Sequence, residues 1–576
     1  MKKLIIIILG LLPLTTIYAQ TDSTLNRTIV VENEYNPTVI DASKVNVLPK
    51  VEEPTVAKKT VEYATTSRKI IGWTKESMIP IERDMMKEKA SRGYLNAGYG
   101  NYGNALLDAG YLWDITNVDR LKVDFLLNGM NGNIYCPMHK RSDDWNSRWY
   151  DTKVKVFYNH VFKPVTLNIG GSYMSQVYNY LGIDSANSLA WVGENKHQHN
   201  TVGDVFVSIA SCDKDLPFQY KLQTGFLYFS QKYSTFGSGN FDTGFYVINE
   251  ESSNNHANYK PDKDIEKKIH TEGEIWTGLK EEQYLGLAFG MDNMIYSPSR
   301  MPNYTSILLN PYYTIEGDVY RAHLGAHIDW LSGDNGGVDF APNVKAEYIF
   351  QNSYILYVNI DGGRQLNDYG FVNGISRYWK MDEFLKPSYT QVDAKIGFRA
   401  SPMSGLWFNV YGGYRMVSND IYSLSTLKFN EPNKGYYTVS FVQSKSKVSY
   451  FGAELRYSYK DLFEIGINGL YQGWKTNGLF EYTDDVLLYY APKFKMDIYA
   501  KGKVYAGLNI DGGLKYIKRY SNQLNDVNDL HVGANYEILK NISVFGQVHN
   551  LLNKEYGILG YPQEKLNFLA GIKLRF

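Results

Sequence analysis

The sequence predicts an all-β protein, a large antiparallel transmembrane β-barrel of about 22 strands that follows a short, mostly extended N-terminal region. Three observations predict this fold class. Apolar and polar residues alternate with a period of two over most of residues 93–576. The breaks between the alternating runs are short at one end of the molecule and long at the other. Aromatic residues make up 15% of the chain, which suits the interfacial girdles of a membrane barrel.

The composition argues against several other classes of protein. Lys+Arg and Asp+Glu balance at 60 each, so we expect no basic surface and no nucleic-acid partner. Two cysteines are too few for a disulfide scaffold or a cysteine-based zinc site. A chain that is 44% apolar can bury a core, which argues against disorder. A mean hydropathy of −0.35 excludes a multi-helix membrane protein, whereas the alternating strands of a membrane barrel average to such a value.

Residues 1–19 have the pattern of a secretory signal peptide. Lys2 and Lys3 precede an apolar run at 4–14 that is too short to span a bilayer. Ala19 stands at the −1 position of the expected cleavage before Gln20. The pattern therefore predicts an exported chain, and an uncleaved N-terminal membrane anchor is the alternative.

Residues 20–92 differ in character from the rest of the chain. They contain four prolines and mixed charges at 52–59, and they show little periodicity. We expect an extended segment in the periplasm or in the barrel lumen, with one short helix at 81–90.

Residues 93–576 read as two-faced strands. In a strand, successive side chains point to opposite faces, so alternation marks one apolar and one polar face. The same pattern recurs at 121–127, 406–415 and 530–538. A barrel this wide cannot fill its interior with apolar side chains, so the polar face is predicted to line the lumen and the apolar face to meet outer-membrane lipid. The last strand shows the pattern most clearly, with Leu566, Phe568, Ala570, Ile572, Leu574 and Phe576 opposite Asn567, Gly571, Lys573 and Arg575.

The lengths of the connections predict the orientation of the barrel. A soluble sandwich or propeller has no reason to place all its long loops at one end, whereas membrane barrels have short periplasmic turns and long extracellular loops. An even strand number returns the C-terminus to the periplasmic side. Short breaks fall at 163–164, 280–282, 318–319, 460–461 and 540–541. Long gaps fall at 130–150, 177–197, 234–267, 366–387, 476–490 and 553–564.

The C-terminal end carries the most specific signals. Phe576 closes an alternating strand, which resembles the signal that the barrel-assembly machinery reads in outer-membrane barrels. An apolar strand at 542–549 is followed by seven residues that resemble the Asn-Leu-x-Asn-Lys-x-Tyr ending of TonB-dependent receptors. The resemblance implies a barrel in the outer membrane of a Gram-negative-type bacterium. The matching residues are Asn550, Leu551, Asn553, Lys554 and Tyr556.

A second resemblance to the same family lies near the other end. Thr28, Ile29, Val30 and Val31 resemble a TonB box, the short segment that pairs with a TonB-type periplasmic protein. An extended β-branched segment of this kind binds by adding a strand to the edge of a sheet. A plain β-strand at the start of the mature chain is the alternative.

The chain departs from the family where a plug domain is expected. The segment at 21–92 is shorter than such a plug, so it is either a reduced plug in the lumen or a periplasmic segment that binds a partner. A wide barrel without a plug would leak, so some obstruction of the lumen is expected. The long loop at 234–267 is one candidate to fold inward.

The loops offer little chemistry, and we expect neither an enzyme nor a resident metal or cofactor. His197 and His199 are close in sequence in a predicted loop but lack further ligands. The acidic pairs at 143–144 and 484–485 and the turn at 334–339 are interpreted as solvated loops. No phosphate loop, nucleophile elbow or His-Glu-x-x-His motif occurs. Cys136 is predicted in an extracellular loop and Cys212 in a periplasmic turn, too far apart for a disulfide.

The resemblance to TonB-dependent receptors implies a transporter that imports an unidentified ligand across the outer membrane, in the class of chelates, vitamins, peptides or glycans. The alternative is a structural or assembly subunit of an outer-membrane complex, in which 21–92 docks a periplasmic partner. A passive porin is the third hypothesis, and it predicts a large conductance unless loops close the lumen.

Overall fold

The computed structural model describes residues 91–576 except 137–143, 185–196, 214–215, 235–262, 281, 299–300, 334–335, 352, 382–383, 432–433, 461 and 478–483. The signal peptide, Thr28, Ile29, Val30 and Val31, and the short helix expected at 81–90 lie outside the described residues. Most of the loop at 234–267 lies outside them as well. In the described part, no helix is both long and apolar enough to cross a membrane.

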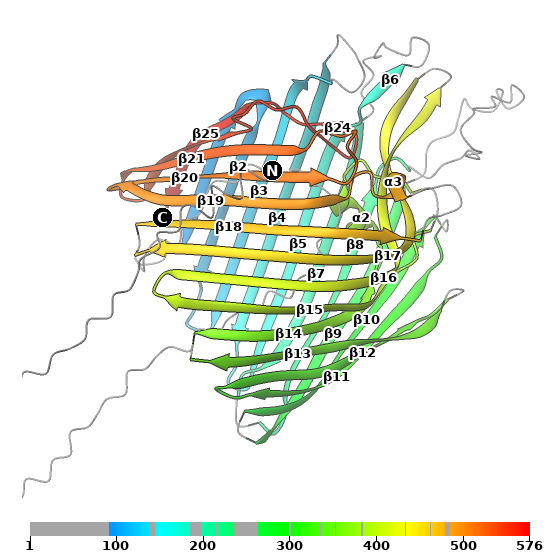
Figure 1. Ribbon diagram of the computed structural model, residues 1–576, viewed down its shortest axis with the longest axis vertical. Coiled ribbons are helices and arrows are strands. Elements are labelled where there is room, and N and C mark those ends of the chain that lie inside the picture. Colours follow the sequence, from blue (N-terminus) through cyan, green and yellow to red (C-terminus); the bar gives the residue numbers. More distant parts are fainter. Residues whose placement is uncertain are drawn as a thin grey trace, which may run out of the picture. The chain divides into compact units, whose positions relative to one another are not determined.

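The described chain consists mainly of β-strands (Figure 1). The helices are η1 (Asn101–Gly103), α2 (Tyr369–Ile375) and α3 (Asp484–Leu487). The first strands are β1 (Gly93–Gly100), β2 (Ala105–Asp114), β3 (Asp119–Ile134), β4 (Trp145–Val161), β5 (Val165–Asn179), β6 (Gly182–Asp184), β7 (His197–Ser211), β8 (Gln219–Gln231), β9 (Asp264–Lys280), β10 (Gln283–Ser297), β11 (Tyr304–Glu316), β12 (Tyr320–Leu331) and β13 (Gly337–Phe350). The others are β14 (Tyr354–Gln365), β15 (Ser388–Met403), β16 (Leu406–Glu431), β17 (Lys434–Tyr459), β18 (Phe463–Thr476), β19 (Pro492–Tyr505), β20 (Leu508–Arg519), β21 (Val527–Leu539), β22 (Ile542–His549), β23 (Gly557–Ile558), β24 (Tyr561–Pro562) and β25 (Asn567–Arg575).

The main sheet closes into an antiparallel barrel. It has 23 strands among the described residues, and 22 remain once β6, which pairs with the tip of β17, is set aside. Closure comes from β1 and β25, which pair from Tyr94↔Arg575 to Gly100↔Leu569. The backbones of Gly93 and Phe576 also exchange hydrogen bonds, of 2.7 and 3.0 Å. The predicted fold class, the strand number and the return of the C-terminus to the starting end are confirmed.

The two ends of the barrel differ as the sequence predicts. At the end that holds Gly93 and Phe576, called the turn end, most connections are tight. Glu282, Lys460 and Asn541 adopt positive φ there, at 64°, 47° and 72°, as tight hairpin turns of two or three residues require. The long connections, between β5 and β7, β8 and β9, β14 and β15, and β22 and β25 among others, all lie at the opposite end, called the loop end.

The faces of the strands also follow the predicted alternation. In β21 and β25 the exposed apolar side chains are Val532, Tyr536, Phe568 and Ile572, all on the outer face. The main buried cluster lies instead at the loop end, inside the ring of strands, and is rich in Tyr and Trp. Packing therefore concentrates where the connections meet.

The β16–β17 hairpin is longer than the sequence pattern suggests. Each strand has 26 residues. β16 pairs with β15 as far as Ser418, and β17 pairs with β18 from Ser446 onward. Beyond these positions the two strands pair with each other. The tip of the hairpin thus extends past the neighbouring strands at the loop end (Figure 1).

Candidate functional site: connections that cross the loop end

The connection between β14 and β15 runs inward and is fastened to β9. Asp368 caps α2, because its side chain accepts a hydrogen bond of 2.7 Å from the backbone of Phe371. The second oxygen of Asp368 accepts from Lys268 at 2.8 Å. The Glu266 carboxylate accepts from the backbone N–H of Tyr369 at 2.6 Å. Carboxylates at a helix N-terminus are favourable because the free N–H groups there carry partial positive charge.

The middle of this connection is fastened to β5 and β7. Asn373 donates to Gln176 at 2.7 Å and accepts from Asn200 at 2.8 Å. The indole N–H of Trp379 donates to the same Asn373 oxygen at 3.3 Å. One amide thereby joins α2, two barrel strands and a fully buried indole.

The connection then reaches β4. Both terminal nitrogens of Arg377 donate to the carboxylate of Asp151, at 3.1 and 2.9 Å. The guanidinium also lies 4.4 Å above the ring of Trp149. Eight barrel strands separate β4 from β14 by the shorter way around the ring, so this segment crosses the lumen.

A second segment crosses in another direction. β6, in the connection after β5, pairs with the tip of β17, and the backbone of Tyr437 donates to Leu181 at 2.8 Å. The rings of Tyr180 and Tyr436 lie 4.6 Å apart. Ten strands lie between β5 and β17 on either side of the ring, so the pairing joins opposite walls.

The connection between β22 and β25 supplies the third segment, which contains β23 and β24. Tyr561 stacks on Tyr378 with ring centroids 3.7 Å apart and an interplanar angle of 10°. Its hydroxyl donates to the backbone oxygen of Tyr437 at 2.6 Å. We call residues 180–184, 366–381 and 550–566 together the lid.

The lid is held by aromatic packing. Tyr178, Tyr180 and Trp379 are at most 1% exposed, and Tyr561 is 2% exposed. Burial raises the pKa of the Tyr180, Tyr378 and Tyr561 hydroxyls, so all three stay neutral at physiological pH. A neutral, tightly packed cluster needs no bound ion to be stable.

A cavity of about 430 Å³ lies between the lid and the wall formed by β3, β4 and β5. Its lining reaches from the lid to Lys153, in the middle of β4. Aromatic faces, one arginine, one lysine and two carboxylates converge on it. Such a lining suits a small ligand with a flat apolar part and a polar edge. The residues that give it this character include Met130, Trp145, Trp149, Asp151, Lys153, Met174, Arg377, Tyr378, Tyr561 and Glu564.

The C-terminal motif residues build the third lid segment. Asn550 adopts a positive φ of 49°, and its side-chain amide donates to the backbone oxygens of Lys554 and Glu564 while its oxygen accepts from the Lys554 N–H. Asn553 accepts from the backbone of Leu566. Leu551 donates its N–H to Leu530, and the backbone oxygen of Tyr556 accepts from Gln563.

The other candidate residues are spread over the molecule. Phe576 lies at the turn end and is 60% exposed as a residue. Cys136 follows β3 at the loop end and Cys212 follows β7 at the turn end, as predicted, and no disulfide joins them.

The prediction that His197 and His199 lie in a loop is wrong, because β7 begins at His197. Each imidazole hydrogen-bonds to β5, His197 to Asn179 at 2.5 Å and His199 to Ser175 at 2.9 Å. The sequence analysis also missed Arg377, Asp151 and Asn373. A long connection containing Tyr, Trp and Arg was the available signal for them.

No protein-family model matches the chain, and no curated protein matches it. Solved structures do match. The ferric-catecholate import receptor Fiu from E. coli K12, in a closed form, has a TM-score of 0.60 at 11% identity. The FrpB iron transporter from Neisseria meningitidis has a TM-score of 0.63 at 10% identity. The ferric enterobactin receptor PfeA from Pseudomonas aeruginosa, in complex with enterobactin, has a TM-score of 0.61 at 14% identity. Each match covers 85% of this chain and 82% of the other.

The chain has the barrel fold of TonB-dependent outer-membrane receptors. At these identities the likeness concerns the fold. The resemblance first noted in Asn550 and its neighbours therefore extends to the fold of the whole barrel.

Proposed function

We propose that the protein is an outer-membrane receptor of the TonB-dependent type that imports a small ligand through a mouth gated by the lid. The observation that carries the proposal is the set of three connections that cross a 22-strand barrel, two of which, 366–381 and 550–566, line an aromatic cavity on its wall. A transporter must stop free diffusion and still let its ligand pass. Loop segments that a few polar contacts hold across the lumen can block diffusion, and they can move aside for a ligand when these contacts break.

The lining of the cavity suggests the ligand class. Aromatic rings stack on flat ligands, and Lys153 can pair with an anionic group, whereas Arg377 is already paired with Asp151. An anionic chelate or another small aromatic acid fits this lining. The structural neighbours are, by their own descriptions, receptors for ferric catecholates and ferric enterobactin, which agrees with that class.

Energy coupling is assigned to Thr28, Ile29, Val30 and Val31. The proposal is that this segment adds a strand to a TonB-type periplasmic protein. Deletion of 28–31 should abolish energised uptake while the barrel still assembles. Ferric enterobactin is the first probe, measured as uptake of radioactive iron by whole cells. Uptake that survives the deletion would remove TonB coupling from the proposal.

The proposal that the lid gates the barrel is tested by single-channel conductance in planar bilayers. Four forms are compared: the intact mature protein, a form without 21–92, a form in which 369–381 is replaced by a Gly-Ser linker, and a form without 235–262. We expect the intact barrel to be closed and the 369–381 replacement to open it. If only the form without 21–92 opens, the head acts as the plug and the lid does not gate. If the intact barrel is already open, the protein is a pore.

The assembly-subunit alternative has one observation in its favour. The tip of the β16–β17 hairpin extends beyond the neighbouring strands and so offers a surface to a partner outside the membrane. Stoichiometric co-purification with other envelope proteins, lost when 420–444 is shortened, would favour this role. Because β6 pairs with Tyr436 and the Tyr561 hydroxyl donates to Tyr437, shortening this hairpin would also loosen the lid, so co-purification and not uptake is the readout for this role.

A further inference from the structure

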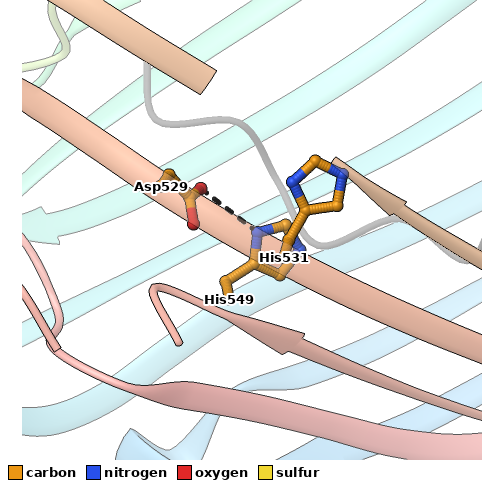
Figure 2. A group of neighbouring side chains, drawn as sticks. All are labelled: Asp529, His531 and His549. Atoms are coloured by element: carbon orange, nitrogen blue, oxygen red, sulfur yellow. Dashed lines mark hydrogen bonds and ion pairs between the residues drawn. The ribbon is translucent and has the colours of Figure 1, made fainter. Parts of the chain in front are cut away.

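Three metal-binding side chains meet on the lumenal wall near the loop end. Asp529 and His531 lie two residues apart on β21, and His549 is the last residue of β22 (Figure 2). The antiparallel register pairs Val532 with Val548. His531 and His549, the next residues toward the loop end, therefore lie opposite each other. Val532 is exposed on the outer face. Alternation therefore directs Asp529, His531 and His549 toward the lumen.

The distances are close to those of a metal site. Nδ1 of His549 lies 3.4 Å from Oδ2 of Asp529. One donor atom from each of the three side chains lies within 4.8 Å of the others. Two ligands bound to zinc at 2.0–2.1 Å in a tetrahedral site are roughly 3.4 Å apart, which the His549–Asp529 pair already matches. The His531 nitrogen needs a shift of at most about 1.4 Å, within reach of rotation about its side-chain bonds.

The carboxylate is held in place by the backbone. Oδ1 of Asp529 accepts a 2.7 Å hydrogen bond from the N–H of Asn550, while Oδ2 faces His549. Fixing one oxygen in this way orients the other, as outer contacts do for known metal ligands. The two imidazole rings lie 5.3 Å apart and nearly parallel, at 17°.

The surroundings can support an ion and its exchange. The side chains of His549 and Asp529 are 26% and 17% exposed, so water reaches them. Asp511 on β20 interacts electrostatically with both histidines and with Lys501 and Lys573. Asp529 would bind a dication directly, and Asp511 would add electrostatic attraction that the two ammonium groups offset in part.

We propose that Asp529, His531 and His549 bind one divalent transition-metal ion through two imidazole nitrogens and one carboxylate oxygen. Imidazole ligands favour Zn²⁺, Cu²⁺ or Ni²⁺ over Ca²⁺ or Mg²⁺. Three protein ligands leave at least one coordination position open toward the lumen, which a water molecule or the donor atom of a chelate fills. The site goes beyond the proposed import function, because it assigns a metal-binding place on the wall itself.

A metal ion at this position would also stabilise the third lid segment. His549 directly precedes Asn550, which begins the third lid segment. A metal ion joining His549 to Asp529 and His531 would clamp the base of this segment to β21. We therefore expect zinc to protect 550–566 from proteolysis.

The test is zinc titration by calorimetry on the full mature protein in detergent, after removal of metals with a chelator and with a purification tag that lacks histidine. We expect about one Zn²⁺ per chain. His531→Asn and His549→Asn should each weaken binding at least tenfold. Asp529→Asn should also weaken zinc binding. The side-chain amide oxygen of the new Asn can still accept the hydrogen bond from the Asn550 N–H, so this variant should fold like the unaltered protein.

The matched control is His270→Asn. His270 also faces two carboxylates, but one ring nitrogen contacts Asp292 and the other contacts Glu272, so these groups do not converge on one ion. The control should bind zinc like the unaltered protein. Heat-modifiable migration in gels verifies that every variant is a folded barrel. Absence of saturable binding to the unaltered protein, or equal binding in all three site variants, would overturn the proposal. Neither result bears on import, which is measured separately.

Discussion

Arg377 shows how a single side chain holds a connection across a barrel. Its planar guanidinium fits the Asp151 carboxylate with two hydrogen bonds and covers the ring of Trp149. Lysine cannot reproduce this fork, because it offers a point charge without a plane. Both partners are about one-fifth exposed, so water screens part of the attraction. The hydrogen bonds and the stacking then matter more than the net charge.

Replacing Arg377 by Ala should loosen the lid by about 2 kcal/mol, the usual value of hydrogen bonds to a charged group. We expect more frequent channel openings in planar bilayers, and Arg377→Lys should restore little of the closure. Arg456→Ala is the matched control, because Arg456 lies over Trp407 outside the lid. Equal opening rates in Arg377→Ala and the unaltered barrel would show that this contact does not hold the lid.

The buried tyrosines make the stability of the lid fall at alkaline pH. Burial raises the pKa of Tyr180, Tyr378 and Tyr561 above the value of the unfolded chain, and it raises the pKa of Tyr490, which packs in the same cluster, to about 12. Their contribution to stability is complete below pH ~10, where both states keep the proton. It falls as the pH rises above that, because the unfolded chain loses protons first.

Titration of tyrosinate absorbance near 295 nm measures this effect. We expect a group of tyrosines that ionises only above pH ~11, together with increased proteolysis of lid segments. Tyr561→Phe should reduce the late-titrating group by one. A single transition near pH ~10 for all tyrosines would contradict the burial described here.

At the scale of elements, Asn550 explains why the third lid segment starts where it does. A positive φ is tolerated by Asn and Gly, and the side chain satisfies backbone groups of 554 and 564. The Asn550–Tyr556 motif is thus a turn-building device in this chain. Asp368 acts similarly for α2, where it satisfies the helix N-terminus and pairs with β9.

Two substitutions of Asn550 separate conformation from hydrogen bonding. Asn550→Gly keeps the backbone angle and should cost about 1–3 kcal/mol for the lost hydrogen bonds. Asn550→Ala should cost about 1 kcal/mol more, because Ala disfavours a positive φ. Limited proteolysis within 550–566 is the measurement. If Ala and Gly behave alike, backbone strain is not a factor at this position.

At the scale of the whole molecule, the barrel closes where its two ends meet. β1 and β25 pair along their length, and Phe576 reaches Gly93 through the backbone and Tyr111 through its ring, 5.9 Å away. The terminal aromatic ring remains largely exposed on the outer face. That position leaves it open to the assembly machinery that the sequence resemblance implies.

Replacing Phe576 by Ala should lower the yield of assembled barrel several-fold while the backbone pairing with Gly93 remains. The yield is measured as the heat-modifiable fraction in isolated outer membranes. Phe568→Ala removes another exposed aromatic ring from the same strand and is the matched control. Equal yields in the two variants would remove any special role for the terminal ring.

The sequence by itself determined the barrel, because strand periodicity and connection length are local properties. The alternation at 566–576, the hairpin turn at 540–541 and the long gap at 366–387 were all readable in one dimension, and the structure agrees with each. It also located Asn550 and Phe576, whose roles depend on neighbours in the chain.

Only the tertiary structure decided which connections cross the lumen and what they touch. Tyr378 and Tyr561 meet, and β6 reaches β17, because ring closure brings opposite walls within the length of one loop. His531 and His549 come together through strand register, which the spacing of two histidines in the sequence does not reveal. Loops have no period, so their contacts follow from the closed ring and not from the pattern of their residues.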